Sequence, residues 1–245
     1  MTNQKINKKV IIIGATSGIG RALAKTLSER GCVLGITGRR LELLQSLQSE
    51  LETQSYVANF DVSNSEDCQK HFQYLLEQLG GVDIVIINSG IGSINPEFPL
   101  QEELQTVAVN VAGFTAIANL AYHYFLAKKF GHIVGVSSVA AVRGGPIASY
   151  NASKAYVSSF LEGLACRAHG QQIDLTITDV RPGFVNTAMA QGDGLFWVAP
   201  VELAAKQIIA GIEREKRVVY VTRRWRLIAG LISLLPFSIY KRLMS

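Results

Sequence analysis

Short apolar runs alternate along the chain with stretches in which apolar residues recur at helical spacing. A short apolar run predicts a strand buried on both faces, and the pattern between the runs predicts helices that cover the sheet. The predicted strands are Val10–Ile13, Cys32–Thr37, Tyr56–Asn59, Val82–Asn88, His132–Ser137, Ile173–Val180 and Val218–Val221. The predicted helices are Gly18–Arg30, Arg40–Leu51, a helix ending at Leu79, Gln101–Lys129, Tyr150–His169 and Pro200–Arg214. This alternation predicts an α/β fold of the Rossmann type: a doubly wound, seven-stranded parallel sheet with helices on both faces, in a single domain over residues 1–245.

Local signals add detail to three of the helices. Ser63 and Glu66 have the spacing of a capping box, which predicts the start of the third helix. Proline favours the first position of a helix, so Pro200 is predicted to open one. The segment Gln101–Lys129 is expected to be one long helix, straight or bent. Asn110 lies inside it, where asparagine is unfavourable unless its side chain has a task.

Composition and charge narrow the class of protein. The chain is 48% hydrophobic and 18% charged, which is enough apolar material for a large core and argues against disorder. The net charge of +5 favours an anionic partner, such as a phosphorylated cofactor or a membrane surface. No recognition motif supports nucleic acid as the partner.

Cysteine and histidine positions argue against a metal site. The three cysteines form no CxxC pair and the four histidines form no HExxH motif. We therefore expect no metal and no disulfide framework, and a reducing, cytoplasmic location. The apolar run after Lys8 and Lys9 is too short for the core of a signal peptide and is read as the first strand.

A glycine-rich segment joins the first predicted strand to the first predicted helix. Gly14, Gly18 and Gly20 have the spacing G-x-x-x-G-x-G. In order, they permit a tight turn, a close approach of the backbone to a pyrophosphate, and close packing of helix on strand. Unpaired N–H groups at the helix start then face the anion. A glycine turn without a ligand is the alternative, but this position in a doubly wound pattern favours binding of a dinucleotide.

Two arginines follow the second predicted strand. Enzymes that prefer NAD usually carry Asp or Glu there to bind the ribose 2′-hydroxyl. This chain has Arg39 and Arg40 instead, so nothing rejects a 2′-phosphate and two guanidinium groups can bind it. Arginines at a helix start oppose the helix dipole, and a nearby anion offsets that cost. The predicted cofactor is NADP(H).

Tyr150 and Lys154 stand four residues apart, on one face of a predicted helix. A phenol is a poor acid or base at neutral pH, and a lysine cation beside it favours the phenolate. Taken alone, the pair could be two residues on a half-exposed helix. Other polar residues, however, fall at the same carboxyl edge of the predicted sheet: Asn88 after the fourth strand, and Ser137 with Ser138 after the fifth.

With these motifs the sequence resembles the short-chain dehydrogenase/reductase family, in its branch of single-domain enzymes. The likeness runs from about Val10 to Val221. The motifs that carry it are Gly14-xxx-Gly18-x-Gly20, Asp61-Val62, Asn88-Ser-Gly90, Asn110, Ser138, Tyr150-xxx-Lys154 and Arg181-Pro-Gly183.

The resemblance implies a catalytic set and a cofactor-binding set. Tyr150 would be the general acid/base, and Lys154 would lower its pKa and hold the nicotinamide ribose. Ser138 would bind the substrate oxygen, and Asn110 would hold a water in a proton relay. The implied cofactor-binding residues are Gly14, Ser17, Gly18, Ile19, Gly20, Arg39, Arg40, Asp61, Val62, Asn88, Gly90, Tyr150, Lys154, Pro182, Gly183, Val185 and Thr187. Among them, Asp61 and Val62 would contact the adenine, Asn88 the ribose side, and the last four the carboxamide.

Three positions depart from the family pattern. Ile13 stands where the family usually has threonine, and Ser89 replaces the alanine of Asn-Ala-Gly. Ser138 lies twelve residues before Tyr150, one fewer than is common. We therefore keep Ser138 by its place in the serine pair, with Ser137 as the lesser candidate.

Two segments near the C-terminus bear on substrate and location. Residues 188–200 resemble a mobile substrate lid. Its apolar residues are expected either to contact an apolar substrate or to pack on the core of the protein: Met189, Leu195, Phe196 and Trp197. Residues 223–245 form a basic and apolar extension. It is too short and proline-broken to span a bilayer; it suits either an interfacial membrane segment or a helix packed on protein.

The leading functional hypothesis is an NADP(H)-dependent carbonyl reductase for an apolar carbonyl or alcohol. The alternative is a regulatory protein that binds NADP(H) without turnover, against which the complete catalytic set argues. A serine hydrolase is excluded, because the sequence around Ser137 lacks the second glycine of a nucleophile elbow. The resemblance further implies a homodimer or homotetramer, formed through the helices Gln101–Lys129 and Tyr150–His169.

Overall fold

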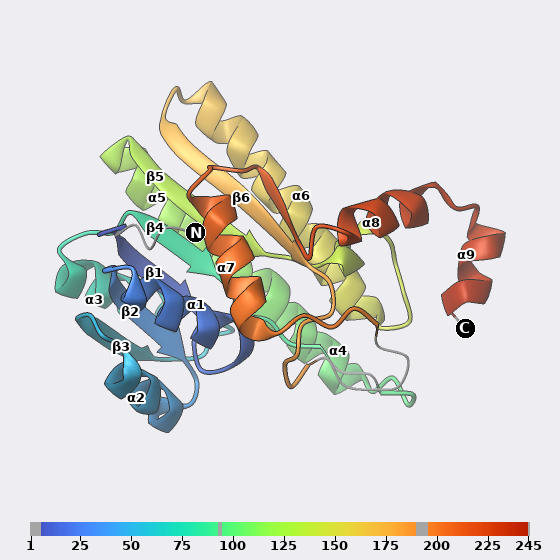
Figure 1. The fold of residues 1–245 in the computed structure, drawn as a ribbon, viewed down its shortest axis with the longest axis horizontal. Helices are drawn as coiled ribbons and strands as arrows, with labels where there is room; N and C mark the ends of the chain where they lie inside the picture. Colours follow the sequence, from blue (N-terminus) through green and yellow to red (C-terminus); the bar gives the residue numbers. More distant parts are fainter. Residues whose placement is uncertain (1–5, 93–94, 190–195, 245) are drawn as a thin grey trace.

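Seven parallel strands form one sheet at the centre of the molecule (Figure 1). The computed structural model describes residues 6–92, 95–189 and 196–244. The strands are β1 (Lys9–Ile13), β2 (Val33–Gly38), β3 (Ser55–Asn59), β4 (Ile84–Ile87), β5 (Phe130–Val136), β6 (Asp174–Pro182) and β7 (Val218–Val221). Their order in the sheet is β3-β2-β1-β4-β5-β6-β7, and every neighbouring pair is parallel. The predicted Rossmann-type sheet is confirmed, and its switch point lies between β1 and β4.

Helices cover both faces of this sheet. They are α1 (Gly18–Glu29), α2 (Leu41–Glu50), α3 (Ser65–Leu79), α4 (Leu100–Val107), the π-helical segment η1 (Ala108–Gly113), α5 (Phe114–Lys128), the 3₁₀ turn η2 (Val139–Val142), α6 (Ala148–Gly170), α7 (Val201–Ile212), α8 (Trp225–Leu234) and α9 (Phe237–Met244). One core cluster joins α3, α5 and α6 to the sheet, and a second joins α1, α2 and α7 to its other face. The helices α8 and α9 extend beyond these layers at the C-terminal end (Figure 1).

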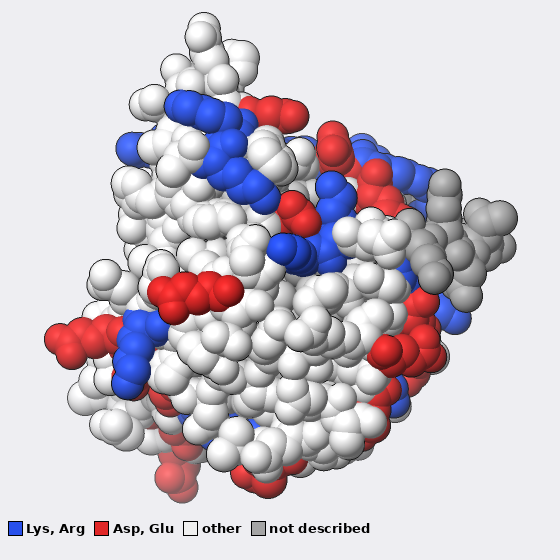
Figure 2. Space-filling model, turned by 90° about the vertical axis from the view of Figure 1, so that its left-hand side faces the viewer, with Lys and Arg blue, Asp and Glu red and all other residues white. Residues whose placement is uncertain are grey.

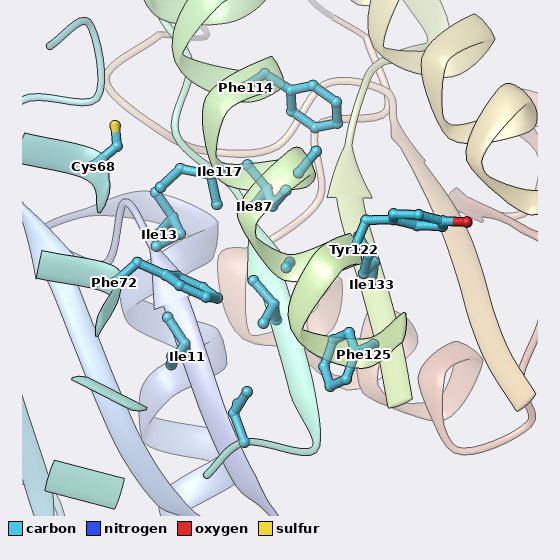
Figure 3. Packing of buried hydrophobic residues seen from close by; sticks show 14 of the residues in the cluster. Ile11, Ile13, Cys68, Phe72, Ile87, Phe114, Ile117, Tyr122, Phe125 and Ile133 are labelled. Carbon is cyan, nitrogen blue, oxygen red and sulfur yellow. The ribbon is translucent and has the colours of Figure 1, made fainter. Parts of the chain in front are cut away.

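The face of the sheet that α3, α5 and α6 cover shows why the apolar runs form buried strands. Phe72 packs beside Ile11 and Ile13, and Phe114 and Phe125 lie farther along the same buried cluster, as Figure 3 shows. All five side chains are at most 3% exposed. Burial on both faces favours apolar residues at every position, so β1 from Val10 onward and β4 are continuous apolar runs rather than alternating ones.

The predicted helix Gln101–Lys129 is divided by a π-helical segment. The α4 helix passes into η1 and then into α5, so the expected long helix is interrupted around Asn110. By length and composition Leu100–Lys128 could cross a membrane. Here, however, α5 is a core helix, because Ile117 and Phe125 are fully buried against the sheet.

Helix starts differ from the expectations in two places. Asn64, and not Ser63, caps α3: its side chain accepts hydrogen bonds from the backbone N–H groups of Glu66 and Asp67. The capping-box prediction was wrong because the Asp61 carboxylate takes both the N–H and the hydroxyl of Ser63 at 2.9 Å. Pro200 precedes α7 as its N-cap, one residue before the first helical position.

A buried histidine between β5 and β6 makes the fold sensitive to acid. His132 is 7% exposed, and its Nε2 lies 2.8 Å from the Thr178 hydroxyl. Burial lowers the pKa of His132 to about 4. The unfolded chain takes up this proton near pH 6.5, whereas the folded chain does so only near pH 4, so protonation favours unfolding between these values.

We therefore expect the free energy of unfolding to fall as the pH is lowered from 6.5 to 4, by up to about 3 kcal/mol from this residue. Urea unfolding at several pH values would measure it. The variant His132→Gln should show a smaller loss over the same range, and His169→Gln, at an exposed position, should match the unmodified chain. An equal slope in all three proteins would contradict the assignment.

Candidate active site

The glycine segment forms a tight loop between β1 and α1, at the switch point of the sheet. Gly14 and Gly18 adopt φ values of +88° and +54°, a region that L side chains rarely occupy. A Cβ on Gly20 would stand 2.0 Å from the Gly14 carbonyl oxygen, so only glycine allows α1 to pack this close. Asn88, after β4, donates from Nδ2 to the same carbonyl at 2.7 Å and fixes the loop.

The first turn of α1 has the features of a phosphate-binding site. Its N-cap, Ser17, makes no side-chain capping bond, so its hydroxyl does not occupy the N–H groups that follow it. Thr187 lies over the loop, with its Cγ2 3.0 Å from the position of a Cβ on Gly18. Beside Gly14, the buried Ser89 hydroxyl lacks a hydrogen-bond partner within the described chain. Backbone donors and an unused hydroxyl at a glycine cradle fit a dinucleotide.

Both predicted arginines border this loop. Arg40 donates from Nη2 to the hydroxyls of Thr16 at 2.9 Å and Ser17 at 3.2 Å. Arg39 lies 3.6 Å from the Asp61 carboxylate, with half of its side chain exposed. Burial raises the pKa of Asp61, but the hydrogen bonds from Ser63 and the charge of Arg39 outweigh it and hold that pKa below its ordinary value. An ionised Asp61 therefore pairs with Arg39, while Arg40 is the arginine that contacts the loop itself.

Tyr150, Ser138 and Lys154 come together at the carboxyl ends of β4 and β5. The Ser138 side chain lies close enough to the Tyr150 hydroxyl to favour its ionised form. The Lys154 Nζ lies 5.6 Å from the centre of the Tyr150 ring and donates to the Val136 carbonyl at 3.0 Å. Because α6 begins at Ala148, Tyr150 lies in its first turn. The predicted catalytic pair and the predicted serine thus form one group.

Burial dominates the protonation of this group. It lowers the pKa of Lys154 to about 8, while the charge of Asp179 acts in the opposite direction. Burial also raises the pKa of Tyr150, and the nearby Ser138 side chain partly offsets this. In this chain Tyr150 is therefore a neutral phenol at pH 7, in the form that donates a proton.

The loop after β4 closes against the catalytic helix. A Cβ on Gly90 would lie 3.0 Å from the Lys154 Nζ, and one on Gly92 would lie 2.5 Å from the Tyr150 ring. Asn110 holds this loop: its Oδ1 accepts from the Ile91 N–H at 2.8 Å, and its Nδ2 donates to the Ile91 carbonyl at 2.7 Å. Asn110 therefore positions this loop, which gives its side chain a function inside the helix. Its role in holding a water stays a prediction.

Asn110 also donates to the Ser153 hydroxyl at 3.0 Å. Its side chain thus ties η1 to both the β4 loop and α6. A π-helical segment is a frequent feature of functional sites, and here it brings an amide side chain from the middle of a helix to the catalytic helix.

The two serines of the pair face different partners. Ser138 meets Tyr150, whereas the Ser137 hydroxyl donates to the buried Asp179 carboxylate at 2.5 Å. Asp179 also accepts from Arg181 at 2.7 Å. This carboxylate, fully buried behind Lys154, was not predicted as a site residue. The available signal was an aspartate at the end of the predicted strand Ile173–Val180, at the carboxyl edge of the sheet.

The segment after β6 returns to the site. The Pro182 carbonyl accepts from Ser138 at 3.4 Å. Val185 is buried and pairs with Ala199, where the chain comes back from the lid. A Cβ on Gly183 would meet the Trp225 indole at 2.1 Å, so α8 packs directly against this segment.

The described residues of the predicted lid make aromatic contacts and remain partly exposed. Phe196 packs on Phe184 and Trp225 with ring centres 5.8 and 5.2 Å apart. Phe196 and Trp197 are nevertheless 47% and 45% exposed. Leu195, with Gly192 and Gly194, lies outside the described residues. Both expected roles of these aromatics, packing and contact with an apolar ligand, are compatible with this arrangement.

The remaining predicted positions lie around the same cradle. Ile19 is partly buried in the first turn of α1, and the buried Val62 follows Asp61 at the end of β3. Among the described residues, no group of three or more His, Cys, Asp or Glu side chains could hold a metal ion.

Comparison with known proteins identifies the family. The model of the short chain dehydrogenase family matches residues 8–194, which is most of the chain. An uncharacterized oxidoreductase of Mycobacterium tuberculosis is 32% identical over 247 residues, with 96% of each chain covered. The protein is therefore a member of the short-chain dehydrogenase family, an oxidoreductase class that binds a nicotinamide cofactor.

A second relative carries a more specific name. The 11-beta-hydroxysteroid dehydrogenase 1A of Arabidopsis thaliana is 33% identical over 242 residues, covering 88% of this chain and 68% of the relative. Solved structures agree in fold. A 3-ketoacyl-(acyl-carrier-protein) reductase of Brucella melitensis, complexed with NADH, superimposes with a TM-score of 0.77 at 22% identity, covering 87% and 96% of the two chains. An NADPH-dependent 3-quinuclidinone reductase of Rhodotorula rubra has a TM-score of 0.74 at 22% identity, covering 89% and 91%.

Proposed function

We propose that this oxidoreductase is an NADP(H)-dependent reductase of an apolar ketone or aldehyde, reversible in principle, with Tyr150 as its general acid/base. The observation that carries the proposal is the meeting of Tyr150, Ser138 and Lys154 at the mouth of a glycine cradle. Two arginines at the far end of that cradle support the choice of the phosphorylated cofactor.

The residues that would hold the cofactor follow the carboxyl edge of the sheet. The loop Gly14–Gly20 and the start of α1 would bind the pyrophosphate, Arg39 and Arg40 the 2′-phosphate, and the segment Pro182–Thr187 the nicotinamide end. When bound, the cofactor supplies the hydride that reduces the carbonyl carbon.

The side chains of the site would then handle the carbonyl oxygen. The hydroxyls of Tyr150 and Ser138 lie close together, so a substrate oxygen placed between them could accept from both. Tyr150, protonated at neutral pH, donates its proton as negative charge develops on that oxygen. The Lys154 cation beside the ring stabilises the phenolate that remains.

An apolar substrate is supported by the surroundings of the site. The described part of the lid presents Met189, Phe196, Trp197 and Val198, which are each between 39% and 47% exposed. Apolar walls with a few polar groups at the reacting atom are typical of small-molecule sites. A relative that carries the name of a hydroxysteroid dehydrogenase agrees with this substrate class.

The arginines give a test of cofactor choice. Replacing both residues, Arg39→Ala with Arg40→Ala, is expected to weaken NADPH binding by about 10- to 100-fold, because charge-assisted hydrogen bonds to the 2′-phosphate are lost. NADH lacks that phosphate, so its dissociation constant should change by less than about threefold. Fluorescence titration with both cofactors measures the difference, and Lys70→Ala, an exposed lysine on α3, serves as the control. Equal weakening of NADH and NADPH would refute the proposed 2′-phosphate site.

A further inference from the structure

The two C-terminal helices carry exposed apolar side chains, and those of α8 face away from the protein. On α8, Trp225 and Ala229 are buried, each 4% exposed, against the body of the molecule. Helical periodicity places Leu227, Leu231 and Leu234 on the opposite side, and they are 78%, 63% and 84% exposed. The next helix adds three more apolar side chains, at 50–68% exposure: Phe237, Ile239 and Leu243. We call these six exposed side chains the C-terminal apolar face.

These helices are fastened to the loop that precedes the catalytic helix. Arg143 donates from Nη1 to the carbonyls of Ile232 at 3.0 Å and Leu235 at 2.5 Å, where α8 ends. Its guanidinium lies 4.3 Å from the centre of the Tyr240 ring. Tyr240 in turn donates from its hydroxyl to the Gly144 carbonyl. The apolar face is therefore held by specific contacts to the folded body.

The charge of the chain is concentrated around this face. Residues 1–215 contain 17 Lys and Arg against 19 Asp and Glu, whereas residues 216–245 contain seven Lys and Arg and no acidic side chain. The whole positive excess of the protein thus lies in this last segment. On the opposite side of the molecule, acidic and basic side chains are interspersed, as Figure 2 shows.

One of these cations has an unused hydrogen-bonding group. Arg217 borders a cavity of about 370 Å³ together with Arg181, Tyr220 and Arg226, the last of which begins the exposed side of α8. The Arg217 Nη1 is buried and has no hydrogen-bond partner in the described chain. A buried guanidinium N–H without an acceptor is costly, and an anionic oxygen would satisfy it.

An exposed tryptophan adjoins the same region. Arg224, immediately before α8, lies 4.5 Å from the centre of the Trp197 ring. Trp197 is 45% exposed. A tryptophan beside arginine, next to exposed leucines, is the combination found at the boundary between lipid and water.

We propose that the C-terminal apolar face docks on a bilayer of anionic phospholipid, with α8 and α9 lying in the headgroup region and their cations contacting lipid phosphates. Spanning is not part of the proposal, because a ten-residue helix is about 15 Å long and a proline separates α8 from α9. A second copy of this chain is the poorer occupant, since a two-fold contact through this face would bring the same seven cations together from both subunits.

Flotation of the full-length protein with lipid vesicles tests the proposal. At low salt, the protein is expected to partition onto vesicles of phosphatidylcholine and phosphatidylglycerol at least about tenfold more strongly than onto phosphatidylcholine alone. Binding should weaken in about 1 M salt, where the Debye length falls to about 3 Å. Failure to bind the anionic vesicles at low salt would overturn the proposal.

Matched variants distinguish binding through this face from nonspecific adsorption of the protein to lipid. The triple variant Leu227→Gln, Leu231→Gln and Leu234→Gln is expected to lower partitioning at least about tenfold. The control, Leu100→Gln with Leu104→Gln, removes leucines that are 73% and 54% exposed on α4 and should leave partitioning unchanged. Thermal unfolding and NADPH binding of each variant show that it is folded.

Equal losses in the triple variant and the control would overturn the proposal. So would a triple variant that binds vesicles normally but sediments as a smaller species than the unmodified chain, since the face would then be a contact between subunits. Sedimentation velocity without lipid makes that comparison.

Discussion

Replacing Tyr150 by phenylalanine is expected to lower the turnover number for carbonyl reduction by at least about 100-fold, the lower range for loss of a general acid. The substitution removes the hydroxyl that meets Ser138 and leaves the ring that packs on Gly92. The affinity for NADPH should change little, because the pyrophosphate and 2′-phosphate sites lie on other elements. Steady-state kinetics with a fluorescence titration of the cofactor separates the two effects.

Tyr156→Phe is the matched control for that variant. Tyr156 lies on the same helix, and its hydroxyl is 2.7 Å from the Thr115 hydroxyl and away from the catalytic group. Its loss is expected to cost some stability and to leave the turnover number within about threefold of the unmodified enzyme. If Tyr150→Phe keeps near-normal turnover, or if both variants lose activity equally, Tyr150 is not the general acid.

The substitution Gly20→Ala is expected to have the largest effect on the cofactor cradle. The new Cβ would stand 2.0 Å from the Gly14 carbonyl oxygen and 2.6 Å from the Asn88 Nδ2, so backbone must move. Overpacking of this kind lowers the free energy of unfolding by about 1–3 kcal/mol or more. Because the same movement displaces the loop, NADPH and NADH should both bind at least about tenfold more weakly.

Gly163→Ala offers the corresponding control on α6. A Cβ there would meet no atom within 4 Å, and alanine favours a helix over glycine by about 1 kcal/mol. This variant should be as stable as the unmodified chain or more stable, with normal cofactor binding. Urea unfolding measures the stability of both variants, and cofactor titration measures their affinities for NADPH and NADH. A Gly20→Ala protein that binds NADPH normally would contradict the close approach on which the cradle depends.

The sheet and its cofactor edge were predictable because they depend on local sequence patterns. The run Val10–Ile13 followed by Gly14 identifies a buried strand and the turn after it without knowledge of distant residues. In a parallel sheet the carboxyl ends of the strands share one edge, so Asn88, Ser138 and Tyr150 could be expected to meet there. The structure brings these residues to that edge, although their chemical roles stay predictions.

Features set by contacts between distant segments could not be predicted in this way. The π-helical segment around Asn110 depends on the loop at Ile91, which takes both ends of the amide. The cap of α3 moved from Ser63 to Asn64 because Asp61 competes for the serine. Nothing local to Asp179 shows that it will meet Ser137, which lies on a different segment of the chain.

The packing of the C-terminal extension also could not be predicted from the sequence. Its composition allowed either a membrane segment or a helix packed on protein, and the structure has features of both. Trp225 and Tyr240 pack on the body, while the leucines of α8 point outward. Composition alone could not separate the two sides, because both are apolar and only tertiary contacts decide which one is covered.

The central claim, transfer of hydride from NADPH to a carbonyl carbon, can be tested most directly with labelled cofactor. NADPH carrying deuterium at the nicotinamide C4 would be supplied with a panel of apolar ketones and aldehydes, and the alcohols formed would be analysed by mass spectrometry. We predict that at least one alcohol carries deuterium on its carbinol carbon, and that the Tyr150→Phe protein forms almost none. Tight binding of NADPH with no oxidation by any compound in the panel would contradict this account and favour a regulatory protein that binds the cofactor without turnover.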